Sequence, residues 1–210
     1  MRTTNGYKAI IFDLGNVLID FDHTIAARRI APFTDKTPKE IYNLFFESPL
    51  TILFEEGKIS AQGFFIKLKT MLNLRLDYEE FLPIWNEIFF ISAKNQAVYG
   101  LADKLKNEYR LLVLSNINTL HFDYLKKQFC LFDIFPYVVA SFQTGFIKPH
   151  PEIYQMALKK LGLLPQEVVY TDDRIELIQG AQRLGITGFH FQNADKLKQD
   201  FLNIGINYEE

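Results

Sequence analysis

The most informative stretch of this chain is Tyr7-Lys8-Ala9-Ile10-Ile11-Phe12-Asp13-Leu14-Gly15-Asn16. It begins as an apolar run and changes at Asp13 into a short flexible segment around a glycine. Short apolar runs of this kind are typical of buried β-strands, so we expect Asp13 at the carboxyl end of a strand. Ligands of open α/β sheets bind at that edge of the sheet. Asp13 is therefore the first candidate for a functional residue.

Polar side chains recur at three later points of the chain, beside apolar runs or prolines. They are Ser115-Asn116 after the run 111–114, Lys148 before Pro149, and Asp172-Asp173 after the run 168–171. Because the carboxyl ends of parallel strands meet at one edge of a sheet, we expect these side chains to lie near Asp13. Hydroxyl, ammonium and carboxylate groups at one edge predict a site for a phosphate group and a metal ion.

Helical and strand patterns alternate from about residue 95 to the end of the chain. Strands are expected over 110–114, 137–140, 167–171 and 186–191, with helices over 98–105, 119–129, 151–161 and 177–184. Repeated alternation of this kind predicts a parallel sheet with helices on both faces. We therefore expect an α/β fold with a Rossmann-like core made of residues 1–20 and 96–210.

The segment between these two parts, residues 21–95, has helix starts but no convincing buried strand. Thr37 and Asp77 each precede a glutamate by three residues, which is the capping-box spacing, and Ser60 is expected to cap a third helix. We expect an all-helical insertion whose aromatic residues form its own core. These aromatic residues are Tyr42, Phe45, Phe46, Phe64, Phe65, Trp85, Phe89 and Phe90.

Composition excludes several classes of protein. The chain has 210 residues, 48% of them apolar, and a net charge of −2 with mixed charges, so no basic surface favours a nucleic-acid or membrane partner. Cys130 is the only cysteine, which excludes an internal disulfide. The polar amino terminus lacks the apolar region of a signal peptide, and no run has the length of a membrane span. We expect a cytoplasmic protein; its oligomeric state is left open.

The order of the polar motifs resembles that of the haloacid dehalogenase superfamily. The stretches FDLGNVLID, VLSN, KP and TDD supply Asp13, Ser115, Lys148 and the pair Asp172-Asp173 in the places of that family's nucleophile, Ser or Thr, Lys and acidic pair. The chain is most similar to the branch with glucose-1-phosphate phosphatases and the amino-terminal phosphatases of epoxide hydrolases. The resemblance implies that the helical insertion is a cap that closes over the sheet edge.

The resemblance also implies a role for each site residue. Asp13 would attack phosphorus and form an aspartyl-phosphate, while Mg²⁺ masks its charge. The metal would be held by Asp13, Asp172, Asp173 and the main-chain carbonyl of Gly15, because Mg²⁺ is usually bound by few carboxylates together with phosphate oxygens and waters.

Four residues are expected to contact the substrate. Ser115 and Asn116 would hold phosphate oxygens through a hydroxyl and main-chain N–H groups, and Lys148 would neutralise the nucleophile and the phosphate. Glu55 belongs to the stretch 55–60, which resembles the cap loop of the family's sugar-phosphate phosphatases. The resemblance therefore implies that Glu55 contacts the substrate.

One departure from the family concerns Gly15. The family's phosphatases usually carry a second aspartate at this place, which protonates the leaving group and then activates water. General acid–base catalysis of this kind typically contributes about 10²- to 10⁴-fold. Replacement by glycine keeps the main-chain carbonyl, so metal binding is expected to survive. Asp20, Asp22 and Glu55 are candidates for the missing role.

The expected function is Mg²⁺-dependent hydrolysis of a small phosphomonoester, with sugar phosphates among the candidates. One alternative is a 2-haloacid dehalogenase, because dehalogenases of the superfamily also lack the second aspartate. They need no metal, however, and the pair Asp172-Asp173 would then face an anionic substrate. The other alternative is a catalytically weak phospho-ligand-binding module, which Gly15 favours and the retained Asp13 and Lys148 oppose.

Overall fold

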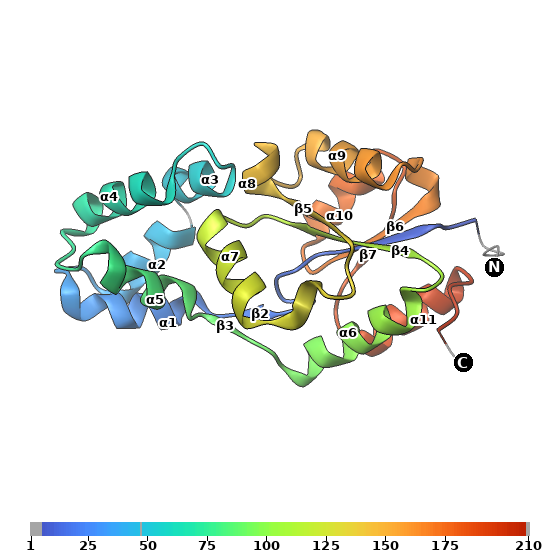
Figure 1. The fold of residues 1–210 in the computed structure, drawn as a ribbon, viewed down its shortest axis with the longest axis horizontal. Coiled ribbons are helices and arrows are strands. Elements are labelled where there is room, and N and C mark those ends of the chain that lie inside the picture. The colour runs from blue at the N-terminus through green and yellow to red at the C-terminus, as the bar shows by residue number, and fades with distance from the viewer. Residues whose placement is uncertain (1–5, 47, 209–210) are drawn as a thin grey trace.

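A five-stranded parallel sheet forms the centre of this computed structural model, which describes residues 6–46 and 48–208 (Figure 1). The α/β class predicted from the sequence is confirmed. Strand β1, which ends before Asp13, lies in the middle of the sheet, and its residues are fully buried. In spatial order the strands are β5 (Tyr137–Ala140), β4 (Arg110–Ser115), β1 (Ala9–Phe12), β6 (Val168–Asp172) and β7 (Thr187–His190).

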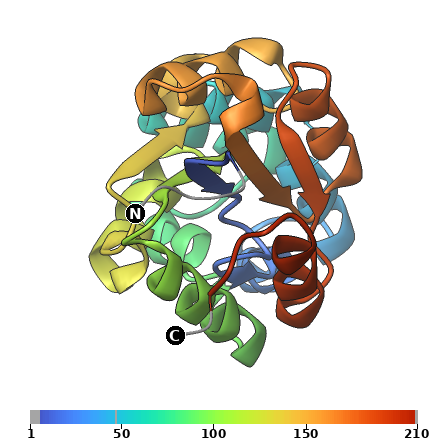
Figure 2. The same ribbon diagram turned by 90° about the vertical axis from the view of Figure 1, so that its right-hand side faces the viewer.

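Helices cover both faces of this sheet, as Figure 2 shows. One face packs against α6 (Ala93–Leu105) and α11 (Ala194–Asn203), and the other against α9 (Pro151–Leu161) and α10 (Ile175–Gln182). The remaining elements of this part are α7 (Thr119–Gln128), α8 (Ser141–Thr144), η2 (Cys130–Phe132) and η3 (Pro165–Glu167).

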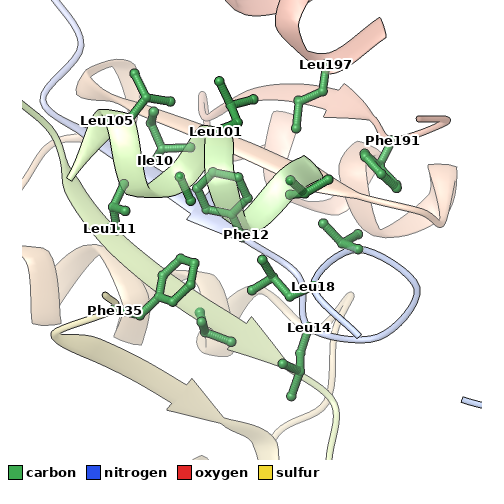
Figure 3. Packing of buried hydrophobic residues seen from close by; sticks show 14 of the residues in the cluster. Ile10, Phe12, Leu14, Leu18, Leu101, Leu105, Leu111, Phe135, Phe191 and Leu197 are labelled. Atoms are coloured by element: carbon green, nitrogen blue, oxygen red, sulfur yellow. The ribbon is translucent and has the colours of Figure 1, made fainter. Parts of the chain in front are cut away.

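Side chains of β1 alternate between the two faces, as the pleat of a strand requires. Ile10 and Phe12 point into the cluster under α6 and α11, whereas Ala9 and Ile11 belong to the cluster under α9 and α10. Figure 3 shows Phe12 near Phe135, and their ring centroids are 5.7 Å apart in an edge-to-face arrangement. Burial on both faces explains why β1 reads as a continuous apolar run.

Five helices form a separate group beside the carboxyl edge of the sheet (Figure 1). They pack around Trp85, whose ring lies 4.9 Å from Phe45 and 5.0 Å from Phe64 between centroids. Most of their aromatic residues therefore form a core of their own, as expected. The helices are α1 (His23–Ile30), α2 (Pro38–Phe46), α3 (Pro49–Glu55), α4 (Ala61–Leu72) and α5 (Tyr78–Asn86), with η1 (Ala31–Phe33) after α1.

Two short strands correct the expectation of an all-helical insertion. β2 (Asp20–Phe21) and β3 (Phe89–Phe90) pair antiparallel where the chain leaves and re-enters the sheet region. Two residues are too few for a strand pattern to be recognised in a sequence. Both connections between the five helices and the sheet therefore run side by side.

Most predicted element boundaries are confirmed within a few residues. The capping boxes of Thr37 and Asp77 form, and Ser60 caps α4. Helix α11 was not predicted, although Asn193 caps it and its apolar residues have helical spacing. Tyr42 and Phe90 are more than one-third exposed and do not fill the insertion's core, while the side chain of Phe46 lies outside the described residues. No described helix has the length and apolar character needed to cross a membrane.

Candidate active site

Asp13 lies directly after β1, at the carboxyl edge of the sheet. Its main-chain N–H donates a hydrogen bond to the carbonyl of Thr171 on β6 at 2.9 Å, so the backbone extends the sheet by one residue. The chain then turns sharply, with Asn16 in a left-handed conformation at φ 57°. The side chain of Asp13 is 10% exposed, which leaves one edge of its carboxylate facing a cavity.

Lys148 joins two of the predicted site carboxylates. Its Nζ atom lies 2.6 Å from Oδ1 of Asp13 and 2.7 Å from Oδ2 of Asp172, and it also donates to the carbonyl of Leu114 at 3.1 Å. The side chain is only 1% exposed. A fully desolvated ammonium group of this kind is fixed in position and is no mobile surface lysine.

Asn116 holds the main chain of Lys148 in place. Its Oδ1 atom accepts a hydrogen bond from the N–H of Lys148 at 2.7 Å, and its Nδ2 atom donates to the carbonyl of Lys148 at 3.1 Å. The side chain of Asn116 is thus engaged with the protein itself, and phosphate binding by its main-chain N–H stays a prediction. Ser115, at the end of β4, is 5% exposed and lines the cavity beside Asp13.

Asp172 and Asp173 lie differently although they are neighbours. Asp172 is fully buried, and its carboxylate accepts hydrogen bonds from Lys148, from the Tyr170 hydroxyl and from the N–H of Arg174. Asp173 is less buried and accepts one hydrogen bond from Asn16 at 2.9 Å. Asp173 therefore has more free oxygen lone pairs directed at the cavity than Asp172.

The carboxylates of Asp13, Asp172 and Asp173 form a group that fits a divalent metal ion. One oxygen of each lies within 4.8 Å of the others. Burial raises the pKa of Asp13 to about 7, with further raising by Asp172 and Asp173 and an opposing effect of Lys148. The negative charge of three carboxylates exceeds the positive charge of the one lysine between them. Carboxylate oxygens are hard ligands, which Mg²⁺ prefers.

Gly15 lines the cavity next to Asp13, and its surroundings explain the missing side chain. A Cβ atom at this position would lie 2.7 Å from Cε1 of Phe21. The ring of Phe21 therefore occupies the space that an aspartate side chain would need. The backbone of Gly15 is outside the left-handed region, so the obstacle is the ring and not the main-chain conformation.

This crowding gives a testable expectation for stability. Gly15→Ala should lower the free energy of unfolding by about 1–3 kcal/mol, because the methyl group forces the Phe21 ring out of its packed position. Urea denaturation measures the change. Phe21→Leu in the same chain should recover part of the loss.

Gly100 provides the matched control for this experiment. It lies in α6, and a Cβ atom added there would meet no neighbouring side chain or other element within 4 Å. Gly100→Ala should therefore raise the free energy of unfolding by about 0.5–1 kcal/mol, since alanine favours the helix over glycine. Equal effects of the two alanine substitutions would show that Phe21 does not crowd position 15.

A cavity of about 230 Å³ lies between the sheet edge and the five helices. Its sheet side carries the polar group around Asp13, and its other walls are mainly apolar. The apolar lining residues include Phe21, Phe45, Ile52, Trp85 and Phe89. The volume is at the small end for ligand sites, so the cavity suits a small molecule with one strongly anionic end.

Three titratable residues of this cavity were missed from the sequence. His23 and His121 line it, and burial lowers their pKa values to about 2 and about 4, so both rings are neutral at neutral pH. Arg174 follows Asp173 and forms an ion pair with Glu176. The histidines gave no sequence signal because their position depends on how the helices pack, whereas Arg174 could have been noticed beside the acidic pair.

Of the three acids that could replace an aspartate at position 15, only Glu55 lines the cavity. Asp20 forms an ion pair with Lys94 at 2.6 Å, and Asp22 caps α1. Burial raises the pKa of Glu55 to about 7, and the positive charges of Arg174 and Lys148 partly oppose this shift.

The main chain of Glu55 is tied to the sheet region by Ser141, which is fully buried. The hydroxyl of Ser141 donates to the carbonyl of Glu55 at 2.6 Å and accepts from the N–H of Ile117 at 2.9 Å. The carbonyl of Ile117 lies 3.2 Å from the same hydroxyl. The end of α3 is therefore docked on the start of α8, which is in turn bonded to the segment that follows β4.

Comparisons with known proteins agree with this geometry. The family model described as haloacid dehalogenase-like hydrolase matches residues 7–185. The chain is 26% identical to a D-ribitol-5-phosphate phosphatase of Bacteroides thetaiotaomicron over 199 residues, which cover 92% of this chain and 96% of the relative. It is 27% identical to a phosphorylated carbohydrates phosphatase of Thermotoga maritima over 190 residues, covering 85% and 82%.

A solved structure has the same fold. It is a HAD family enzyme from Bacteroides thetaiotaomicron in complex with magnesium and inorganic phosphate, with a TM-score of 0.77 and 24% identity. The similarity covers 89% of this chain and 94% of the other.

Proposed function

The chain belongs to the haloacid dehalogenase-like hydrolase family, and we propose that it is a Mg²⁺-dependent phosphatase that acts on a small phosphomonoester through an aspartyl-phosphate. One observation carries the proposal: the buried Lys148 bridges Asp13 and Asp172, while Asp173 lies within 4.8 Å of both carboxylates. This arrangement provides a fixed nucleophile, a fixed positive charge and a place for a metal ion in one cavity.

Asp13 is the nucleophile in this proposal. Its carboxylate attacks phosphorus, and the bond from phosphorus to the ester oxygen breaks. Lys148 holds Oδ1 of Asp13, which directs the other oxygen towards the cavity. Ser115 is placed to bind a phosphate oxygen, and Asn116 acts by fixing the main chain of Lys148.

Asp13, Asp173 and the main-chain carbonyl of Gly15 are the proposed direct ligands of Mg²⁺. Asp172 has its oxygens occupied by three hydrogen bonds, so it supports the site by holding Lys148. Bound Mg²⁺ supplies positive charge that reduces the repulsion between Asp13 and an incoming phosphate.

We further propose that residues 21–95 act as a cap over a core made of residues 1–20 and 96–210. The support is that the five helices have their own apolar core and contribute the wall of the cavity opposite Asp13. Sugar or polyol phosphates are the proposed substrates, because the cavity is small and the two relatives act on D-ribitol 5-phosphate and on phosphorylated carbohydrates.

Phosphate release from a panel of esters tests the function. With Mg²⁺ the protein should hydrolyse at least one of a set of sugar, polyol and aryl phosphates. A chelator should lower the rate to background, and added Mg²⁺ should restore it, because Lys148 alone does not balance the charge of three carboxylates. A haloacid is tested beside the esters. Release of halide in the presence of chelator would identify a dehalogenase instead.

A further inference from the structure

The proposed reaction needs a proton donor for the leaving oxygen, and position 15 cannot provide it. The ring of Phe21 fills the space beside Gly15. A donor must therefore come from another titratable residue that lines the same cavity. Among the described residues this set is Asp13, His23, Glu55, His121, Lys148, Asp173 and Arg174.

Most of these groups already have another role in the proposed reaction or cannot release a proton. The proposed function uses Asp13 and Asp173 as nucleophile and metal ligand, and Lys148 is bound between two carboxylates. An arginine does not release its proton at ordinary pH. His121 is fixed by Asn118 and by the carbonyl of Trp85 at 3.1 Å.

The two histidines are also neutral, since burial lowers the pKa of His23 to about 2 and that of His121 to about 4. Neither holds a second proton that it could donate at neutral pH. Glu55 is the one remaining acid of this set.

The end of α3, which carries Glu55, and the turn after it are held against the sheet region at two points. Ser141 binds the carbonyl of Glu55 at 2.6 Å. Two residues later, Gly57 packs so closely on the carbonyl of Phe142 that a Cβ atom would lie 2.2 Å from its oxygen. Glu55 therefore faces the cavity from a fixed main chain.

We infer that Glu55 is the general acid and then the general base of the phosphatase reaction, so that the helical segment supplies the group that position 15 lacks. The inference rests on the proposed function. It assigns to Glu55 a direct catalytic role, beyond contact with the substrate.

The protons balance in both steps. As Asp13 attacks phosphorus, the breaking bond leaves an ester oxygen that takes the proton of the Glu55 carboxyl, and the alcohol departs. The Glu55 carboxylate then accepts a proton from water, whose oxygen attacks the phosphorus of the aspartyl-phosphate. The bond from phosphorus to Asp13 breaks, which gives inorganic phosphate, the free Asp13 carboxylate and protonated Glu55.

The charges around Glu55 suit both roles. Burial raises its pKa to about 7, and Arg174 and Lys148 face it with opposing positive charge. A group with a pKa near the working pH can both donate and accept a proton efficiently.

Three esters with different leaving groups test the inference: nitrophenyl phosphate, phenyl phosphate and an alkyl phosphate, each with Mg²⁺. Glu55→Gln should lower kcat on the phenyl and alkyl esters by about 10²- to 10⁴-fold, because these oxygens leave poorly without a proton. Nitrophenol should still be released rapidly in the first turnover and slowly afterwards, because the second step lacks its base.

The pH profile gives a second readout. For the alkyl ester, kcat/KM of the wild-type protein should fall as the pH rises through about 7, where Glu55 loses its proton. Glu55→Gln should lack this descending limb. If Glu55 only binds substrate, Glu55→Gln would raise KM and leave kcat unchanged.

Glu56→Gln is the matched control. Glu56 pairs with Lys58 at 2.9 Å and does not line the cavity, so this variant should keep wild-type rates on all three esters. Glu55→Asp retains a carboxyl group and should recover part of the rate on phenyl phosphate. Circular dichroism checks that each variant is folded.

Two outcomes would overturn the inference. One is an equal loss on all three esters with no rapid first turnover; the other is a raised KM with unchanged kcat. If the wild-type protein and Glu56→Gln release no phosphate from any ester, the proposed function itself is wrong. If they do release phosphate, the proposed function stands, and the behaviour of Glu55→Gln decides whether Glu55 is the general acid and base.

Discussion

Asp13→Asn should abolish phosphate release, with a loss of about 10⁵-fold or more, as expected when a catalytic nucleophile is removed. The amide has nearly the shape of the carboxylate but is a poor nucleophile, so no aspartyl-phosphate forms. Its oxygen can still accept the hydrogen bond from Lys148, and Lys148 keeps its second partner, Asp172. Steady-state hydrolysis of an ester found active for the wild-type protein measures the loss.

Folding should survive this substitution. Burial disfavours the ionised form of Asp13, so a neutral amide at this position should change the free energy of unfolding by less than about 1 kcal/mol. Asp103→Asn, on the exposed side of α6, is the control and should leave the rate unchanged. Wild-type turnover by folded Asp13→Asn would exclude the covalent mechanism.

Lys148→Met should both inactivate and destabilise the protein. The substitution leaves the carboxylates of Asp13 and Asp172 buried without their common cation, and breaking a buried ion pair in this way typically costs about 3–5 kcal/mol. Urea denaturation in the presence of chelator isolates this effect from metal binding. Hydrolysis should be lost even under conditions where the variant remains folded, because the nucleophile is no longer oriented.

The matched control for this variant is Lys106→Met, which breaks a surface ion pair of 2.6 Å with Asp103. Exposed pairs contribute about 0–1 kcal/mol, so the two methionine variants should differ clearly in stability. Adding Asp13→Asn to Lys148→Met removes one of the two stranded charges and should recover part of the loss. Equal stabilities of the two single variants would mean that water enters the cavity and solvates Asp13 and Asp172.

The sheet and the central part of the site could be predicted because they depend on local patterns. Strands β1, β4 and β6 are buried on both faces and therefore read as apolar runs. Their carboxyl ends meet at one edge, which brings Asp13 and Asp173 together from distant parts of the sequence. Helix α11 could also have been recognised from Asn193 and the spacing of its apolar residues.

The rest of the site depends on packing between distant segments, which leaves no periodic signal in the sequence. The ring of Phe21 crowds Gly15 only because the pairing of β2 with β3 fixes its direction. The side chain of Asn116 binds main-chain atoms of Lys148 because two distant segments meet there, and the sequence does not show that meeting. The sequence identified Glu55 as one of three acids that could replace an aspartate at position 15. Only the arrangement of the helices shows that Glu55 lines the cavity whereas Asp20 and Asp22 do not.

The hydroxyl of Ser141 influences the free energy needed to separate the end of α3 from α8. It has one proton and two carbonyl oxygens within reach, those of Glu55 at 2.6 Å and Ile117 at 3.2 Å, and it donates to one of them at a time. If the end of α3 lifts away, the proton turns to Ile117 and no buried donor is stranded. Separation then costs only the net stabilisation of one hydrogen bond, about 0.5–1.5 kcal/mol. The larger penalty of a buried donor without a partner does not arise. The hydrogen bond of Ser141 to Glu55 therefore adds little to the free energy needed to separate the end of α3 from α8.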